Sequence, residues 1–411
     1  MVVELGKNAK KATKEIARLS KKKKNEVLKQ VADALIKNIK PILEANQKDL
    51  DYAKTNNINQ ALFDRLLLTE DRINEMAEGL LTLVGLEDSM GKILEMNERP
   101  NGLMISKKVV PLGVIGIIYE ARPNVTIDAF GLCFKTNNCV ILRGGKEAIN
   151  SNVELVKIVR ETLEKNGVNK NVIQIVTDTS RNSSNALMKM NDYLDLLIPR
   201  GGQGLINAVV KNSTVPVIQT GVGNCHVYVD EFADIDMAVQ ISYNAKVQRP
   251  GVCNSCETII VHRKKAELFL KKLGNRFDGI VEVRGDDYTM NYIPYASKAT
   301  KLDYETEFHD FIISIITVNT IDEALEHIEK FSTNHSEAII TENHQNAQRF
   351  LDEVDSSAVY VNASTRFTDG FEFGYGAEIG ISTQKLHARG PMGLKELTTI
   401  KYVIYGNGQI R

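Results

Sequence analysis

The stretch V-V-P-L-G-V-I-G-I-I-Y, Val109 to Tyr119, marks the place where the character of this chain changes. It is apolar and rich in β-branched residues, which is typical of a strand buried on both faces of a parallel sheet. Residues 1–90 instead carry helical periodicity, with Val27, Val31, Leu35 and Ile39 spaced to form one apolar stripe. We therefore expect a helical opening followed by a parallel α/β sheet.

Strands and helices alternate beyond Tyr119. The first round of expected elements comprises the strands Cys139–Leu142, Val172–Val176, Leu194–Ile198 and Val215–Gln219 and the helices Glu147–Lys165 and Ser183–Met190. The second comprises the strands His226–Val229, Thr258–Val261, Phe311–Val318, Ala338–Thr341 and Ala358–Val361 and the helices Asp234–Lys246, Ile321–Phe331 and Gln345–Glu353. This repetition predicts an α/β fold class with two doubly wound lobes. Glycines interrupt the pattern between Gly221 and Asn224, so we expect the boundary there.

The composition narrows the classes of function. A chain of 411 residues exceeds one ordinary core, and 43% hydrophobic with 25% charged residues is typical of a soluble globular protein. The net charge of -1 provides no field that would attract nucleic acid or an anionic membrane. The basic run Lys21–Lys24 is expected to be a solvated helix face. The sequence contains no membrane-length apolar run and no signal-peptide core, so a cytoplasmic location is expected.

The cysteines pose a choice between three chemistries. Cys253 and Cys256 form a C-x-x-C in Q-R-P-G-V-C-N-S-C-E-T-I, which suits half of a metal site, a redox dithiol or a single working thiol. No second C-x-x-C or H-x-x-x-H completes a zinc site, and five irregularly spaced cysteines favour reduced thiols, so no metal is expected. Cys256, Cys133, Cys139 and Cys225 are interpreted as small buried hydrophobic residues. Cys253 follows Pro-Gly on a turn and suggests covalent catalysis at a carbonyl carbon.

Two glycine-rich turns fall where strands are expected to end. L-R-G-G-K-E-A and I-P-R-G-G-Q-G each lie between a strand and a helix N-terminus, where backbone N–H groups favour an anion. They supply the candidate cofactor-binding residues Arg143, Gly144, Gly145, Lys146, Arg200, Gly201 and Gly202. Arg143 and Lys146 favour the 2′-phosphate of NADP over NAD. The alternative is that glycine stands in these turns only to allow a positive φ.

Longer motifs carry a resemblance to a known family. N-A-K-V-Q-R-P-G-V-C-N, Asn244–Asn254, resembles the cysteine segment of the aldehyde dehydrogenase superfamily. Y-E-A-R-P-N-V-T-I-D-A (Tyr119–Ala129), G-A-E-I-G-I-S-T-Q-K-L-H-A-R-G-P-M-G-L (Gly376–Leu394) and the closing Y-G-N-G-Q-I-R resemble the γ-glutamyl phosphate reductase family within it. The similarity covers essentially the whole chain. It implies two lobes of aldehyde dehydrogenase type, a helical N-terminal segment and a small oligomerisation element.

The resemblance also implies a division of the chain. An NADP-binding domain would span residues 1–223, interrupted by a hairpin at 97–110. The catalytic cysteine domain would span 224–375, and the segment 376–411 would return to the cofactor lobe. The hairpin and a strand at Thr398–Tyr405 would form the oligomerisation element of a homodimer or a tetramer of dimers.

The activity implied by the resemblance is that of an oxidoreductase. It is the NADPH-dependent reduction of L-glutamyl 5-phosphate to L-glutamate 5-semialdehyde with release of phosphate, the second step of proline biosynthesis from glutamate. Cys253 matches the family nucleophile and would carry the γ-glutamyl group as a thioester. Glutamate 5-kinase is a candidate partner. Another acylating aldehyde dehydrogenase, or an inactive partner subunit of the kinase, is the alternative.

Further roles follow from matching motifs. Asn124 in R-P-N would donate to the developing oxyanion beside the Cys253 N–H; its alternative role is a helix N-cap. Glu307 in T-E-F-H-D-F would hold the nicotinamide ribose, with Glu305 as the other candidate. The Q-T-G-V-G-N stretch from Gln219 lacks the water-activating glutamate of hydrolytic relatives.

The substrate carries an α-ammonium, an α-carboxylate and a phosphate, and basic side chains must bind the two anionic groups. The candidates within the matching motifs are Arg122, Arg249, His387 and Arg389. For His387 two further interpretations stay open, a general acid or base and a buried, hydrogen-bonded histidine.

Overall fold

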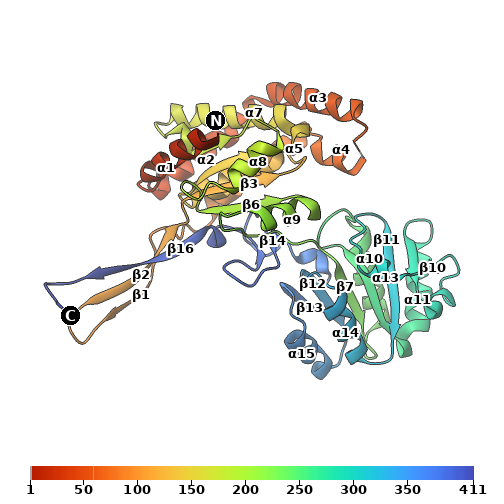
Figure 1. Cartoon of the computed structure of the whole chain (residues 1–411). Coiled ribbons are helices and arrows are strands. Elements are labelled where there is room, and N and C mark those ends of the chain that lie inside the picture. The colour runs from red at the N-terminus through yellow and green to blue at the C-terminus, as the bar shows by residue number, and fades with distance from the viewer. Residues whose placement is uncertain (1, 59) are drawn as a thin grey trace. The chain divides into compact units, whose positions relative to one another are not determined.

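The computed structural model describes residues 2–58 and 60–411, and the chain folds into two compact units (Figure 1). Unit 1 holds the chain through Thr220 together with Gly374–Gly380 and Met392–Arg411. Unit 2 holds Gly221–Phe373 and Ile381–Pro391. The sequence placed the boundary after residue 223 and kept 376–411 in one piece, whereas the structure assigns Ile381–Pro391 to unit 2. Its strand Ile381–Ser382 (β14) pairs there with Gly390–Pro391 (β15).

Unit 1 begins with the expected helices and continues with a four-stranded sheet. Its elements are α1 (Val2–Ile16), α2 (Lys21–Lys37), α3 (Ile39–Thr55), α4 (Gln60–Leu66), α5 (Glu70–Gly85), β1 (Ile93–Glu98), β2 (Met104–Pro111), β3 (Val114–Tyr119), α6 (Asn124–Lys135), β4 (Cys139–Arg143), η1 (Lys146–Ala148), α7 (Ile149–Lys165), η2 (Lys170–Val172), β5 (Ile173–Ile175), α8 (Arg181–Met188), β6 (Leu196–Arg200), α9 (Gln203–Asn212), η4 (Lys395–Leu397) and β16 (Thr398–Tyr405).

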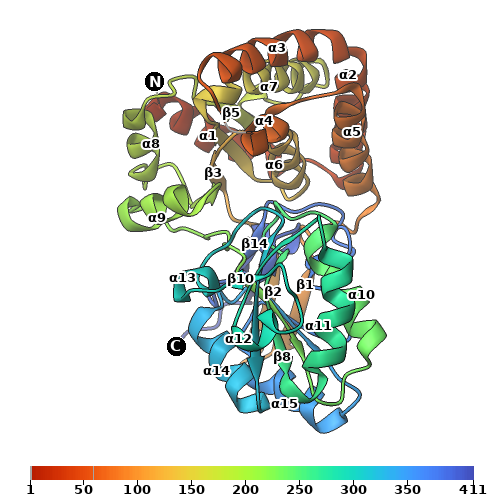
Figure 2. The same cartoon turned by 90° about the vertical axis from the view of Figure 1, so that its right-hand side faces the viewer.

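The order of this sheet is β5-β4-β3-β6, and every pairing in it is parallel. All residues of β3 are buried, as the apolar run that opens the parallel sheet predicted. Figure 2 shows α2, α3, α5 and α7 packed beside one another. Because parallel strands end at one edge of their sheet, the loops after β3, β4 and β6 come together there.

The helical opening differs from the expected stripe at two places. The stripe through Ile39 is split, since α2 ends at Lys37 and α3 starts at Ile39. Pro41 explains the restart, because proline fits the first turn of a helix and disrupts an interior. Lys24, expected on a solvated face, is buried and forms an ion pair with Asp88 at 2.7 Å, so the solvated interpretation of this lysine is wrong.

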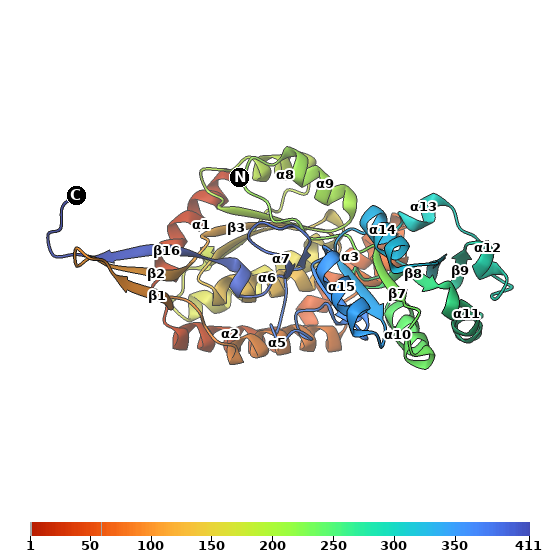
Figure 3. The same cartoon turned by 90° about the horizontal axis from the view of Figure 1, so that it is seen from below.

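A second sheet of unit 1 consists of three strands in the order β1-β2-β16, all antiparallel. β1 and β2 form the hairpin expected at 97–110, and β16 pairs along the full length of β2. In Figure 3 these strands extend as a ribbon away from the helices of unit 1. Apolar side chains remain exposed on it, namely Ile93, Leu94, Met96, Ile400, Tyr402, Ile404 and Tyr405.

Unit 2 is built on a seven-stranded sheet in the order β10-β9-β11-β8-β7-β12-β13, again parallel throughout. Besides β14 and β15, its elements are β7 (Cys225–Val229), α10 (Ile235–Val247), β8 (Cys256–His262), α11 (Arg263–Phe277), β9 (Glu282–Gly285), α12 (Asp287–Met290), β10 (Ser297–Lys298), α13 (Lys301–Tyr304), β11 (Ile312–Val318), α14 (Ile321–Phe331), β12 (Ser336–Ile340), α15 (His344–Glu353), β13 (Ala358–Val361) and η3 (Thr365–Phe367).

Alternating side chains of the central strands pack on opposite layers. Val227 and Ile259 share a core with α10 and α11, whereas Tyr228 and Ile260 share another with α14 and α15. This is the doubly wound arrangement that the sequence predicted. Within the described residues, no helix combines the length and hydrophobicity that crossing a membrane requires.

Candidate active site

Cys253 lies in the turn between α10 and β8. All five cysteines fall within the described part of the chain; Cys253 is half-buried, and the other four are buried as expected. Burial raises the pKa of the Cys139 thiol to about 12 and raises those of Cys133, Cys225 and Cys256 as well. These four thiols therefore stay protonated and unreactive, and Cys253 is the accessible sulfur.

The residue after the nucleophile anchors this turn. Asn254 is buried, and its Nδ2 donates to the carbonyl oxygens of Thr368 at 2.9 Å and Arg366 at 3.2 Å. Thr365 Oγ1 returns a hydrogen bond to the Asn254 carbonyl at 2.8 Å. The cysteine turn is thus fixed against the segment that follows β13.

A glycine packs directly against the backbone of Cys253. A Cβ atom on Gly223 would lie 1.4 Å from the Cys253 carbonyl oxygen, which also accepts a hydrogen bond from Cys225 Sγ at 3.2 Å. The Gly223 N–H donates to Glu307 Oε1 at 2.9 Å. The other oxygen, Oε2, lies 3.1 Å from His309 Nε2. Glu307 therefore borders the nucleophile turn, whereas Glu305 is exposed and pairs with Lys301, which favours Glu307 of the two candidates.

A guanidinium that the sequence did not single out is bound to the residue directly after the nucleophile. Arg366 Nη1 donates to Asn254 Oδ1, and the Arg366 charge interacts with Cys253 and with Arg249. Its Nε is buried without a hydrogen-bond partner. Burial lowers the pKa of Arg366, although it stays cationic. A polar stretch directly after the apolar strand β13 is the signal that could have indicated this residue.

The remaining predicted residues of unit 2 lie on its surface. Arg249, His387 and Arg389 are all exposed, so the buried alternative for His387 is wrong. His387 has a left-handed φ of 66°, and Arg389 Nη2 contacts Asp355 Oδ1 at 2.7 Å. Lys385 also pairs with Asp355, so these contacts tie the loop between β14 and β15 to the end of α15.

In unit 1, Asn124 is the first residue of α6, and the N-cap position belongs to Pro123. The N-cap alternative for Asn124 is therefore wrong. Its Nδ2 donates to Asp128 Oδ2 at 3.1 Å, one turn along the helix. Desolvation raises the pKa of Asp128 to about 7, with Asn124 and Arg200 opposing the shift. Arg122 is half-buried in the loop before the helix.

The two glycine turns lie at the carboxyl edge of the parallel sheet, on either side of β3. Gly145 and Gly202 have φ of -61° and -71°, so the alternative that glycine only allows positive φ is wrong for them. The Gly202 N–H donates to Glu120 Oε2 at 2.8 Å, and a Cβ on Gly201 would lie 2.6 Å from the same oxygen. The start of α9 thus accommodates an anionic group at close range.

The two basic residues of the first turn behave differently. Arg143 donates to the carbonyl oxygens of Gly144, Thr179 and Ser180, so its guanidinium holds the loop before α8. Lys146 is exposed, and its Nζ lies 5.8 Å from the centre of the Tyr52 ring.

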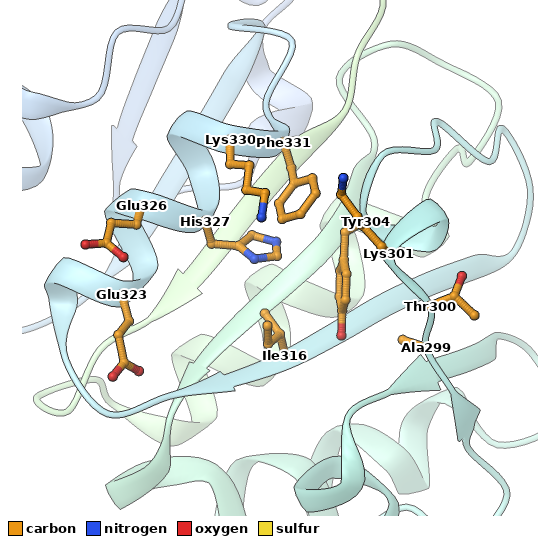
Figure 4. Close-up of a pocket in the computed structure, with 10 residues that line it drawn as sticks. All are labelled: Ala299, Thr300, Lys301, Tyr304, Ile316, Glu323, Glu326, His327, Lys330 and Phe331. Carbon is orange, nitrogen blue, oxygen red and sulfur yellow. The ribbon is translucent and has the colours of Figure 1, made fainter.

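A cavity of about 430 Å³ lies in unit 2 between α13, α14 and β11 (Figure 4). It is lined by Ala299, Thr300, Lys301, Tyr304, Ile316, Glu323, Glu326, His327, Lys330 and Phe331. None of these is a predicted site residue. Asn224 Nδ2 donates to the Tyr304 and Phe331 carbonyl oxygens at 2.7 and 2.8 Å, so this region supports the strand that follows Gly223. In residues 2–58 and 60–411 no cluster of metal-ligating side chains occurs.

Comparison with known proteins identifies the family. The sequence profile of the aldehyde dehydrogenase family matches residues 2–302 and 304–403. A gamma-glutamyl phosphate reductase of Lachnospira eligens is 58% identical, covering 99% of both chains. The crystal structure of gamma-glutamyl phosphate reductase from Thermotoga maritima superimposes with a TM-score of 0.96 at 46% identity, over 100% of this chain and 99% of that one.

A more distant structure shows the shared fold alone. An engineered glycolyl-CoA reductase with bound NADP+ superimposes with a TM-score of 0.72 at 15% identity, over 98% of this chain and 96% of that one. The family match and the high identities together decide the assignment: the chain belongs to the aldehyde dehydrogenase family and, within it, to the gamma-glutamyl phosphate reductases.

Proposed function

We propose that the chain catalyses the NADPH-dependent reduction of L-glutamyl 5-phosphate to L-glutamate 5-semialdehyde with release of phosphate. Similarity over the full chain to reductases of that name supports this. The observation that carries the proposal is the accessible Cys253 sulfur on a turn held by Asn254, Gly223 and Cys225. The reaction is a step of proline biosynthesis from glutamate.

Cys253 acts as the nucleophile. Its thiolate attacks the acyl carbon, the C–S bond forms, and the C–O bond to phosphate breaks with its electron pair leaving on phosphate. Negative charge develops on the former carbonyl oxygen, and the Cys253 N–H and Asn124 Nδ2 are the proposed donors to it. Gly223 packs closely against the Cys253 carbonyl and fixes its position. This in turn fixes the direction in which the Cys253 side chain points.

Nicotinamide use belongs to the aldehyde dehydrogenase family, and the bound cofactor supplies the hydride that reduces the thioester. The residues present fit it. At the start of α9, Gly201 and Gly202 lack a Cβ, the Gly202 N–H already donates to a carboxylate oxygen, and Arg200 adds positive charge. Glu307 is proposed to bind the nicotinamide ribose.

The preference for NADPH over NADH is assigned to Lys146. Because Arg143 is occupied by three carbonyl oxygens, the exposed Lys146 is the better ligand for the 2′-phosphate. In Lys146→Ala the KM for NADPH is expected to rise about tenfold, the value of one charge-assisted contact, while the KM for NADH stays unchanged. Equal effects on both cofactors would contradict the assignment.

We further propose that the chain forms homo-oligomers through the β1-β2-β16 sheet, whose apolar side chains remain exposed. A cytoplasmic location and an encounter with glutamate 5-kinase, which would supply the unstable acyl phosphate, complete the proposal.

The reverse reaction tests the function. NADP+ reduction with glutamate 5-semialdehyde is expected to require inorganic phosphate and to be lost in Cys253→Ala. Turnover that does not require phosphate, or that requires CoA, would indicate another acylating aldehyde dehydrogenase. Full activity of Cys253→Ala would remove the sulfur from the mechanism, and an inactive wild-type protein would favour an idle partner subunit.

A further inference from the structure

Arg366 stands on η3, the short turn that follows β13. Its backbone carbonyl accepts from Asn254 Nδ2 at 3.2 Å, and its Nη1 donates to Asn254 Oδ1. The side chain is thereby tied to the residue directly after Cys253. Thr365, the residue before Arg366, donates from its Oγ1 to the Asn254 carbonyl at 2.8 Å and fixes the same turn from a second side.

The donors of this guanidinium are incompletely used. Arg366 Nε is buried and has no hydrogen-bond partner, although an arginine carries five N–H donors. A buried N–H donor without an acceptor lowers the stability of the fold. Such a donor is expected where a bound ligand supplies the missing acceptor. An oxyanion with two acceptor oxygens matches the guanidinium fork.

The surrounding charges point to an anion as that ligand. Arg366 interacts with Arg249, a second cation, and with Cys253. The acids near the nucleophile turn are Asp369, whose Oδ1 accepts from the Phe371 N–H at 2.8 Å, and Glu307, which accepts from the Gly223 N–H and lies 3.1 Å from His309 Nε2. Both carboxylates thus have partners of their own, whereas the buried Arg366 Nε has none, so the donor left open at the nucleophile turn belongs to a cation.

The chemistry of the substrate selects which anion lies there. In an acyl phosphate the phosphoryl oxygen is bonded to the carbon that Cys253 attacks, whereas the α-carboxylate of a glutamyl group is separated from that carbon by three others. A cation held against the nucleophile turn is consequently better placed for the phosphate. We propose that Arg366 binds the phosphoryl group of the substrate at Cys253, an inference that rests on the proposed function.

The contact serves both directions of one step. In the forward direction the C–S bond forms, the C–O bond breaks, and Arg366 stabilises the phosphate as it departs with the electron pair. In reverse, inorganic phosphate binds to Arg366, attacks the thioester carbon and releases the Cys253 thiolate. Hydride transfer precedes the phosphate step in this direction and needs no phosphate.

This order of events separates a binding role from a structural one. Without phosphate, enzyme mixed with glutamate 5-semialdehyde and NADP+ should produce one burst of NADPH as Cys253 is acylated. Arg366→Gln is expected to keep that burst and to raise the KM for phosphate tenfold or more, by roughly the value of a charge-assisted contact. Arg366→Lys keeps the positive charge but loses the paired N–H donors of the guanidinium, so its KM for phosphate should lie between those of wild type and Arg366→Gln.

Arg349→Gln is the matched control, because Arg349 lies on α15 and pairs with Asp322 and Glu353 away from the turn. It should leave the burst and the KM for phosphate unchanged. A KM for phosphate within twofold of wild type in Arg366→Gln overturns the assignment, as does loss of the burst in both Arg366 variants. A wild-type protein whose turnover ignores phosphate overturns the proposed function together with it.

Discussion

Gly223 is the residue on which the geometry of Cys253 depends most closely. The obstacle to a larger residue is the backbone carbonyl of Cys253, and backbone cannot rotate away as a side chain can. The same glycine donates its N–H to Glu307, so one position joins the proposed nucleophile to the proposed ribose ligand. A small change there is transmitted to both.

Gly223→Ala is expected to lower kcat about a hundredfold, because displacing the nucleophile by an ångström costs that much. NADPH binding should weaken as well, because the Gly223 N–H holds Glu307, the proposed ribose ligand. Stopped-flow acylation and cofactor titration measure the two effects. Gly79→Ala is the control, because beyond the adjacent backbone of its own helix nothing lies within 4 Å of its added Cβ. Wild-type acylation in Gly223→Ala would show that the turn is not rigid.

Asp128 provides a prediction of pH dependence. Its pKa is raised from 3.8 to about 7 in the folded chain, so its ionisation opposes folding. Below pH 4 the Asp128 carboxyl is protonated in both the folded and the unfolded chain, so it does not affect the free energy of unfolding. Between about pH 4 and 7 that free energy falls in wild type relative to Asp128→Asn, by up to about 4 kcal/mol. Denaturant unfolding of both proteins across this range measures the difference. A gap that stays constant with pH would contradict the raised pKa.

At the scale of elements, a buried ion pair joins α10 to β8 behind the nucleophile turn. Lys246 and Glu257 are fully buried and 2.7 Å apart, and Glu257 Oε1 has no hydrogen-bond partner. Desolvation raises the pKa of Glu257 to about 8, although Lys246 opposes the shift. Such a pair holds two elements in register without adding much net stability.

Lys246→Met is expected to lower the free energy of unfolding by about 3–5 kcal/mol, because it leaves a buried carboxyl unpaired. The double variant Lys246→Met/Glu257→Leu should recover most of that loss. Chemical unfolding measures both, with the exposed i,i+4 pair of Lys271 and Glu267 as the control, where Lys271→Met should have almost no effect. A double variant no more stable than the single one would refute this account.

The elements that the sequence predicted are those with strong apolar patterns, such as β3, β8 and α14. The expected strand Val215–Gln219 is replaced by a single bridge between Leu197 and Val217, because Pro216 lacks the N–H that a ladder needs. α11 and β9 were not expected, and the polar charged face of α11 hides its buried stripe. The local hydrophobic pattern of the sequence predicts such elements least reliably.

For the site, the same limit applies more sharply. Cys253 and the glycine turns carry local motifs and were predicted. Arg366 was not, because its importance arises from its contact with Asn254, which lies 112 positions away in the sequence. Contacts of that range follow from the topology of the sheet, in which β13 pairs with β12 and β12 pairs with β7, and no motif encodes this order.

At the scale of the whole molecule, the chain leaves and re-enters its units more often than the sequence suggested, and the last strand ends on the β1-β2 hairpin. Ile400, Tyr402 and Ile404 are exposed there. A contiguous apolar surface on a sheet is typical of a protein interface. The assembly proposed above depends on it.

Ile404→Lys is expected to reduce the mass in solution, because a charge in an apolar interface opposes association. Sedimentation velocity measures the mass. Leu268→Lys is the control, since Leu268 on α11 is equally exposed but lies outside the sheet. An unchanged mass in both variants would locate the interface elsewhere, or show that the protein is a monomer.

The most direct test of the account concerns one sulfur atom. The enzyme is mixed with glutamate 5-semialdehyde and NADP+ without phosphate, quenched in acid and digested, and the peptide that contains Cys253 is weighed. This peptide is expected to gain the mass of a γ-glutamyl group and to lose it when phosphate is added before quenching. A Cys253 peptide that never carries that mass, in an enzyme that turns over normally, would contradict it.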